Sequence, residues 1–158
     1  MAQESFSTPF GTPSTGSTQQ YSGRVNITVS GIGASNSTAL NDAFYNVPSG
    51  SVEPSGYYQL GFGTSPLSPY DAANAIVNLL GARPAYNAAH IYSFALNLGA
   101  TPTNLYFGVT DGQFQDNSGA FQISISPVPE PAAWALMMAG FCIVGVAMRR
   151  RKVAVTYA

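Results

Sequence analysis

Hydrophobic and polar residues alternate along several short stretches of this chain. Four stretches show the pattern, residues 21–30, 92–98, 105–110 and 121–126, and residues 43–47 and 57–62 are predicted as two further short strands between Pro and Gly residues. Because successive side chains of a strand point to opposite faces, the alternation predicts strands with one buried face. Clusters of Gly, Pro and Asn between these stretches predict turns. We therefore expect a mainly β domain, folded as an antiparallel β-sandwich of jelly-roll type.

One internal stretch has a helical pattern instead. Residues 68–71 begin with a Ser that can cap a helix, followed by a Pro suited to the first helical position and an acidic residue in the first turn. Apolar residues between Ile76 and Leu80 would form its buried stripe, and Gly81 would end it. The sequence therefore predicts one short helix within the β domain.

A long apolar run lies near the end of the chain. Residues 132–148 carry no charge. The basic cluster that follows is Arg149, Arg150, Arg151 and Lys152. At 1.5 Å per residue the run would form a helix of about 25 Å, and snorkelling basic side chains can bridge the gap to a hydrocarbon core of about 30 Å. The pattern predicts a single C-terminal transmembrane helix, with residues 1–128 outside and 153–158 as a short cytoplasmic tail.

The residues before this run are more specific. Pro129, Glu130 and Pro131, placed directly before a short apolar helix and a basic cluster, resemble the PEP-CTERM sorting domain of bacterial proteins associated with exopolysaccharide. The resemblance implies that residues 128–152 are a sorting signal and that an exosortase, a membrane-embedded cysteine protease or transpeptidase, cuts near the motif. It also implies transient anchoring in the inner membrane, followed by the cell surface or extracellular matrix. A plain tail-anchored envelope protein is the alternative.

The chain therefore divides into four expected parts. Residues 1–20, rich in Ser, Thr, Pro, Gly and Gln, are expected to be a flexible arm. Residues 21–127 would form the ectodomain, residues 128–152 the sorting signal, and residues 153–158 the tail. The first residues lack the basic start and apolar core of a signal peptide, so we expect that an N-terminal leader is missing from this sequence.

Charge and composition restrict the partners. Charged residues make up 8% of the chain, and before the sorting signal the only cations are Arg24 and Arg83. Nucleic acid and anionic lipid need clustered cations, so neither is expected as a ligand of the ectodomain. The abundance of Ser, Thr, Asn, Gly, Tyr and Phe suits contact with carbohydrate. An extracellular polysaccharide is the expected ligand class.

The sequence offers no obvious catalytic or thiol-based metal site. The one cysteine, Cys142, lies in the apolar run, so neither a disulfide nor a thiolate site can form in the ectodomain. The one histidine, His90, has no second His to complete a zinc cluster or catalytic dyad, and we interpret it as a residue at the end of a strand.

The loop from Asp111 to Gly119 is the one stretch with candidate metal chemistry. Calcium prefers hard oxygen ligands, which Asp111, Asp116 and Asn117 could supply together with backbone carbonyls. Calcium is the only cofactor that we expect. The alternative is ordinary turn chemistry, because Asp-Gly and Asn-Ser-Gly also suit any hairpin without a metal.

The same loop with its flanking strands resembles the C-terminal part of the calcium-dependent galactophilic lectins of PA-I type. The resemblance rests on Phe107, on Asp111-Gly112 and on the run from Asp116 to Phe121. It implies that calcium held by Asp111, Asp116 and Asn117 would also ligate sugar hydroxyls. The loop here is shorter than in those lectins, and Gln113 falls near the position of a Thr ligand.

These features together predict an exported bacterial protein that is not an enzyme. Its ectodomain would have a binding or structural role, with exosortase, the membrane and polysaccharide as partners and no nucleic acid. The alternative is a carbohydrate-active enzyme of jelly-roll type, since paired carboxylates can cleave glycosides. The acids available for such a pair are Asp42, Glu53, Asp71, Asp111 and Asp116.

Overall fold

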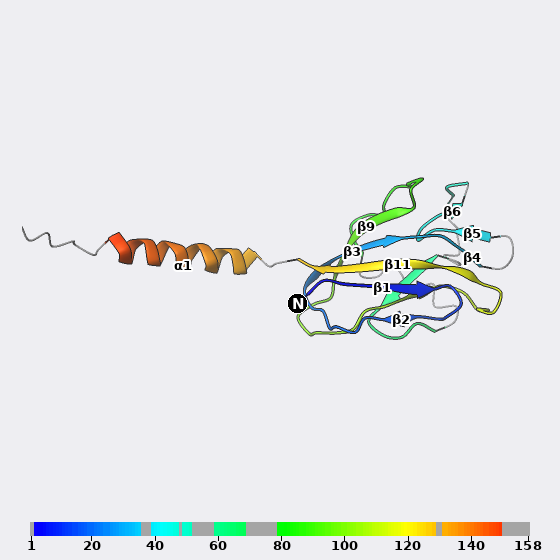
Figure 1. Ribbon diagram of the computed structural model, residues 1–158, viewed down its shortest axis with the longest axis horizontal. Helices are drawn as coiled ribbons and strands as arrows, with labels where there is room; N and C mark the ends of the chain where they lie inside the picture. Colours follow the sequence, from blue (N-terminus) through cyan, green and yellow to red (C-terminus); the bar gives the residue numbers. More distant parts are fainter. Residues whose placement is uncertain are drawn as a thin grey trace, which may run out of the picture. The chain divides into compact units, whose positions relative to one another are not determined.

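The computed structural model describes residues 2–35, 39–47, 49–51, 59–68, 79–128 and 131–149. The chain divides into two compact units, residues 1–128 and residues 129–158. The described part of the first unit, here called the β domain, consists of strands and turns, and the described part of the second is a helix (Figure 1). The expectation of a mainly β protein is confirmed.

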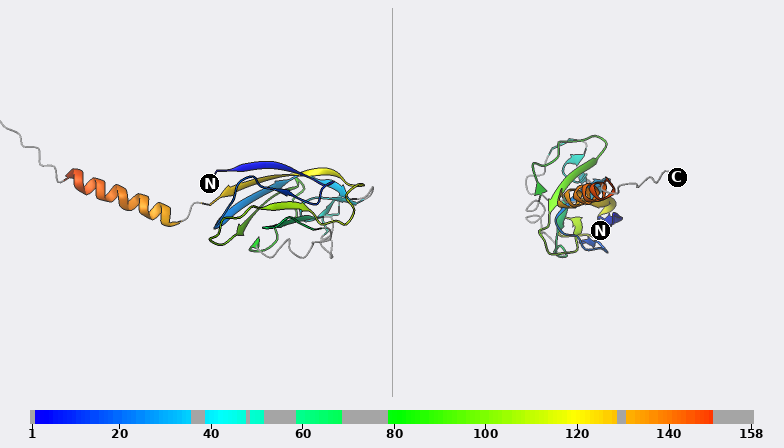
Figure 2. Two further views of the ribbon diagram at one scale, coloured as in Figure 1. Left: turned by 90° about the horizontal axis from the view of Figure 1, so that it is seen from below. Right: turned by 90° about the vertical axis from the view of Figure 1, so that its left-hand side faces the viewer.

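Two antiparallel sheets make up the described part of the β domain. The large sheet contains β1 (Glu4–Pro9), β3 (Arg24–Ser30), β4 (Gly33–Ser35), β5 (Ala39–Asn41), β6 (Asn46–Val47), β8 (Leu79–Leu80), β9 (Ile91–Asn97) and β11 (Ser118–Pro127). The small sheet contains β2 (Thr15–Gly16), β7 (Leu60–Gly63) and β10 (Tyr106–Val109). The large sheet follows the order β6-β5-β4-β11-β3-β9-β8, and β1 pairs with β11 outside this path. The left view of Figure 2 shows β1, in blue, beside β11, in yellow.

The inner face of the large sheet packs against the small sheet. Alternate residues of β3, β9 and β11 are buried there, as the sequence predicts, and they meet buried side chains of β7 and β10. Phe62 of β7 links the two sheets, because its ring lies 5.3 Å from that of Phe94 in β9; within the small sheet it lies 6.4 Å from the ring of Phe107. Burying such large apolar side chains is the main force that holds the two sheets together.

The large sheet bends where β3 passes into β4. The pairs Ser30–Gln122 and Gly33–Gly119 share one register with β11, but pairing is interrupted between them. Gly31 and Gly119 have φ values of 111° and 93°, and a Cβ on either would lie about 2.5 Å from a carbonyl oxygen of the opposite strand. Only glycine permits this conformation and this approach. The sheet can therefore curl at this point.

The prediction of a jelly-roll β-sandwich is wrong. The described strands form one large, open and curled antiparallel sheet with a small sheet of three strands on its inner face, whereas a jelly roll has two sheets built from two Greek keys. Alternation shows which strand face is buried, but it does not show which strand edges pair. The glycine bend and the pairing of β11 with β1, β3 and β4 decide the architecture.

Three local predictions also need correction. The predicted flexible arm contains β1 and β2, because Phe6 and Thr8 alternate with exposed serines and Phe10 is fully buried. Most of the predicted helix lies outside the described residues, but its end is strand β8, which pairs with Leu96 and Ala95 of β9. In the predicted strand 43–47, only the last two residues belong to a strand, β6.

The predicted transmembrane helix is wrong as well. The second unit contains α1 (Pro131–Arg149), and among the described residues no helix is long and apolar enough to cross a membrane. The apolar run amounts to about 25 Å of helix, less than the roughly 30 Å of a hydrocarbon core, and the helix ends on the cation Arg149.

Candidate functional site

The loop between β10 and β11 is organised around the carboxylate of Asp111. This side chain is 9% exposed. Its Oδ1 accepts hydrogen bonds from the backbone N–H groups of Gly112 at 2.6 Å and Gln113 at 3.2 Å, and its Oδ2 accepts one from Nδ2 of Asn117 at 2.9 Å. Nδ2 of Asn117 also donates to the carbonyl oxygen of Phe10 at 3.0 Å. The loop is thereby tied to the end of β1.

This geometry brings together two of the three predicted calcium ligands. Asp111 and Asn117 contact each other, whereas Asp116 is exposed to solvent. Both carboxylate oxygens of Asp111 accept hydrogen bonds from the protein, which is the turn chemistry that the sequence also allows. Within the described ranges, no three His, Cys, Asp or Glu side chains gather into a metal-binding group. Calcium binding stays a prediction.

A second polar cluster surrounds Asp42, which is fully buried in the turn between β5 and β6. Its Oδ1 accepts hydrogen bonds from the N–H groups of Phe44 at 2.9 Å and Tyr45 at 2.7 Å. Its Oδ2 lies 2.9 Å from Nδ1 of His90 and accepts a hydrogen bond from the Tyr92 hydroxyl at 2.6 Å. Burial, and then the hydrogen bond to Asp42, raise the pKa of Tyr92 well above its ordinary value.

His90 lies directly before β9, which agrees with its interpretation as a strand-end residue. Its φ of 53° is unusual for a residue with a side chain, and it directs the ring toward Asp42, 48 positions earlier in the chain. This partner of His90 is not predictable from the sequence, because no local signal connects residues so far apart. The hydrogen bonds of Asp42 reach Tyr92, His90 and backbone N–H groups, so the cluster fastens the β5–β6 turn to β9.

Among the described acids considered for glycoside cleavage, Asp42 and Asp111 belong to separate networks. Asp42 is bonded to His90 and Tyr92, whereas Asp111 is bonded within its own loop. Glu53 and Asp71 lie outside the described residues. The absence of enzymatic activity stays a prediction.

The outer face of the large sheet is polar and almost uncharged. We call it the polar face, and it is formed by Ser5 and Ser7 of β1, Gln122, Ser124 and Ser126 of β11, Asn26, Thr28 and Ser30 of β3, and Ser93 and Asn97 of β9. These side chains are exposed or half-buried, because they alternate with the buried core positions. The strand register places Ser5, Ser124, Thr28 and Ser93 in one row across four strands.

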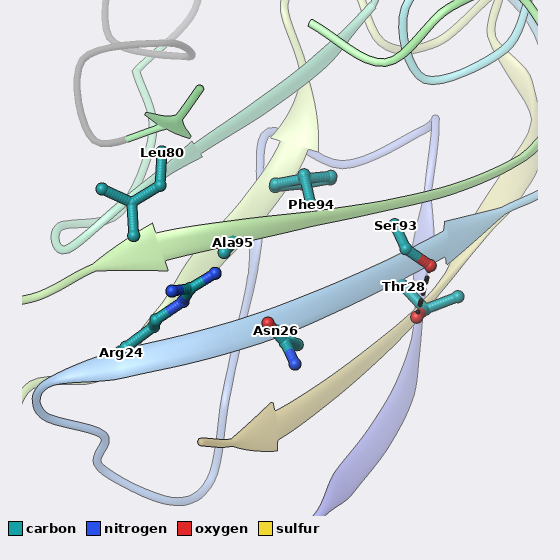
Figure 3. Close-up of a pocket in the computed structure, with 7 residues that line it drawn as sticks. All are labelled: Arg24, Asn26, Thr28, Leu80, Ser93, Phe94 and Ala95. Carbon is teal, nitrogen blue, oxygen red and sulfur yellow. Dashed lines mark hydrogen bonds between the residues drawn. The ribbon is translucent and has the colours of Figure 1, made fainter. Parts of the chain in front are cut away.

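A shallow groove of about 420 Å³ lies at one side of the polar face. Its walls come from Arg24, Asn26 and Thr28 of β3, Ser93, Phe94 and Ala95 of β9, and Leu80 of β8 (Figure 3). The hydroxyls of Thr28 and Ser93 are 3.1 Å apart and hydrogen-bonded. Figure 3 shows the Arg24 side chain reaching from β3 toward Ala95. The alternation in the sequence predicts Arg24 on the same strand face as Asn26 and Thr28, but it gives no indication of the groove.

The predicted sorting residues lie around α1. Pro131 is the first residue of this helix, where its missing N–H costs nothing, and Arg149 is the last. Pro129, Glu130 and the rest of the basic cluster, Arg150, Arg151 and Lys152, lie outside the described residues. The β domain is ordered up to this motif, since the N–H of Val128 donates to the carbonyl oxygen of Arg24 at 3.0 Å.

Comparison with known proteins identifies one segment. No curated protein and no solved structure matches the chain, and the resemblance to the galactophilic lectins therefore gains no support. Residues 127–152 match the family model of the PEP-CTERM protein-sorting motif. The matched range begins at the last residue of β11 and contains α1. This chain thus carries a PEP-CTERM sorting motif, which implies an exported protein that an exosortase processes.

Proposed function

We propose that the β domain is a non-enzymatic binding module that the sorting motif delivers to the extracellular matrix, where its polar face contacts polysaccharide. The observation that carries this proposal is the row of Ser5, Ser124, Thr28 and Ser93 across four strands. Neighbouring strands are about 4.8 Å apart, so the row offers a hydroxyl at each such step. Side chains at spacings of this size can bond to successive hydroxyls of an extended glycan.

The hydroxyls of this row can bond to a ligand while they bond to each other. Ser5 donates to Ser124 at 3.1 Å, and the hydroxyls of Thr28 and Ser93 are hydrogen-bonded to each other at 3.1 Å. These bonds hold the side chains in fixed orientations. Each hydroxyl has one donor and two acceptor positions, so the row retains hydrogen-bonding capacity toward solvent. Fixed neutral groups of this kind favour a polar ligand that is rich in hydroxyls.

Delivery is tested on the motif. In a host with an exosortase, Glu130→Ala should leave uncleaved protein of full length, detected by immunoblot of cell fractions. Asp116→Ala, which removes an exposed acid of the β domain, is the matched control and should be processed normally. Normal processing of the Glu130 variant would show that the motif residue has no part in sorting.

Ligand binding is tested on the row. Thr28→Val combined with Ser124→Ala removes two hydroxyls from the polar face, and Thr101→Val combined with Ser65→Ala removes two exposed hydroxyls elsewhere. Retention of the exported protein on immobilised host polysaccharide should weaken about tenfold for the first pair, because each lost hydrogen bond costs roughly 0.5–1.5 kcal/mol. Equal retention of both double variants would exclude the polar face as the contact surface.

A further inference from the structure

We propose that the groove beside Arg24 binds the carboxylate of an acidic polysaccharide, so that the matrix ligand contains uronic-acid residues. This inference rests on the proposed function, since it names the ligand class of the polar face. The outward-facing residues of β1, β3, β9 and β11 include a single charged residue, and that residue is Arg24. A lone cation on a neutral face selects for an anionic group at one point of the ligand.

The surroundings of Arg24 leave its guanidinium available. The side chain is exposed, and the residues that line the groove include no acid. Across the described part of the chain, Arg24 takes part in no salt bridge; the one ion pair there joins His90 to Asp42. A guanidinium presents a planar fork of N–H donors that fits the two oxygens of a carboxylate. The guanidinium of Arg24 is therefore suited to bind a carboxylate from outside the domain.

The rest of the groove offers hydrogen bonds and an apolar contact in addition to the ion pair with Arg24. A solvent-exposed ion pair contributes little affinity by itself. Here the amide of Asn26 and the hydroxyls of Thr28 and Ser93 continue along the groove from Arg24 and can bond to ring hydroxyls (Figure 3). Leu80, which is 42% exposed, adds an apolar surface for the C–H face of a sugar ring. A carboxylated sugar matches all three kinds of contact.

Other anionic ligands fit the groove less well. Nucleic acid needs several cations to displace its counterions, and the polar face has one. An acidic peptide would normally bind by adding a strand to a free sheet edge. The groove lies instead on the sheet face, where β3 is paired on both sides with β11 and β9, and β9 with β3 and β8. Contacts must therefore come from side chains, as in saccharide recognition.

The test uses the full chain, with polygalacturonate as the acidic probe and its methyl ester as the neutral probe of the same backbone. Arg24→Gln is compared with Arg83→Gln, which makes the same change of charge at the other cation of the β domain. We expect the dissociation constant for polygalacturonate to rise about tenfold for Arg24→Gln and to stay within twofold for Arg83→Gln. Arg24→Lys should recover only part of the loss, because it lacks the planar fork.

Four outcomes would overturn the inference. Equal weakening by both Arg variants would indicate only a change in net charge, and equal affinity of the wild type for the methyl ester would show that no carboxylate is recognised. Arg24-dependent binding of poly-glutamate as tight as that of polygalacturonate would assign the groove to acidic peptides. Retention of host polysaccharide that is unaffected by Arg24→Gln would leave the proposed function standing without this inference. An unchanged melting temperature for Arg24→Gln confirms that the exposed substitution leaves the fold intact.

Discussion

Two buried carboxylates of the β domain, Asp42 and Asp111, each accept hydrogen bonds that hold a turn, but their partners lie at very different separations along the chain. Each accepts two backbone N–H bonds from its own turn. The remaining oxygen of Asp42 reaches His90 and Tyr92, 48 and 50 residues away, whereas that of Asp111 bonds to Asn117, six residues away. The first carboxylate therefore joins two parts of the fold, and the second mainly shapes one loop. Substitutions at the two positions should differ accordingly.

Asp42→Ala should have the largest effect on stability. It removes the acceptor for two N–H groups and for the buried Tyr92 hydroxyl, and it leaves His90 without its partner. Leaving several buried polar groups unpaired should lower the free energy of unfolding by about 3 kcal/mol. Chemical denaturation of the wild type and the variant measures this loss.

Two further variants show what this loss comes from. Asp42→Asn retains one acceptor oxygen for the turn but sets an amide NH₂ opposite the Tyr92 hydroxyl, so its effect should be intermediate. Asp116→Ala, at an exposed acid, should stay within about 0.5 kcal/mol of the wild type. If Asp42→Ala were no more destabilising than Asp116→Ala, the cluster would not fasten the β5–β6 turn to β9.

Asp111→Ala should destabilise the domain less, by about 1.5 kcal/mol, because the lost bonds lie within one partly solvated loop. The lost partner of Asn117 also weakens the tie from this loop to Phe10. Amide hydrogen exchange should therefore quicken at Gly112 and Gln113, whose N–H groups lose their acceptor, while β9 stays protected. Loss of protection throughout β9 would mean that the loop supports the whole fold and that the contrast with Asp42 fails.

The separation of contacting residues along the chain also explains which features of the fold can be predicted from the sequence. Alternation alone gives the buried faces of β3, β9 and β11, because it depends only on residues two apart. The Asp111 turn is predictable for the same reason. The bond from Asp42 to His90 and the bend at Gly31 and Gly119 are not, since they depend on segments that meet only after folding. The one-sided burial predicted for β10 is wrong, since Gly108 and the following Thr110 are buried as well as Phe107 and Val109. Strand β1 is an intermediate case for prediction. Phe6, Thr8 and Phe10 alternate with polar residues, but the polar composition around them conceals the pattern.

A third carboxylate, Glu4, is expected to make the stability of the β domain depend on pH. Its oxygens accept hydrogen bonds from the N–H and hydroxyl of Thr18, the N–H of Gln19 and the hydroxyl of Tyr21. Burial alone would raise the pKa of Glu4, but the hydrogen bonds together lower it below its ordinary value of 4.5. Burial and the bond to Glu4 raise the pKa of Tyr21 to about 12.

Because the pKa of Glu4 is lower in the folded state, its contribution to stability is present above pH 4.5 and is lost as the pH falls through the folded value. Glu4→Gln should therefore destabilise the domain by about 1 kcal/mol at pH 7, and this loss should become smaller as the pH is lowered to 3. Urea unfolding at the two pH values measures the difference, with Asp116→Asn as a control for removal of an exposed acid. A penalty for Glu4→Gln that is as large at pH 3 as at pH 7 would show that ionisation of Glu4 does not stabilise the fold.

The smallest effect is expected from calcium, and it tests what the Asp111 loop does. A ligand that binds only the folded state stabilises it by RT ln(1 + [L]/Kd), which is about 2.7 kcal/mol at a hundredfold excess over Kd and raises the melting temperature by several degrees. The oxygens of Asp111 already accept bonds from Gly112, Gln113 and Asn117, so millimolar calcium should leave the melting temperature unchanged relative to chelator. A rise that Asp116→Ala abolishes would instead establish the predicted calcium site. It would also show that the loop rearranges so that the Asp111 carboxylate becomes available to a metal. Asp42 could not make such a change, because it would have to break its hydrogen bonds to His90 and Tyr92.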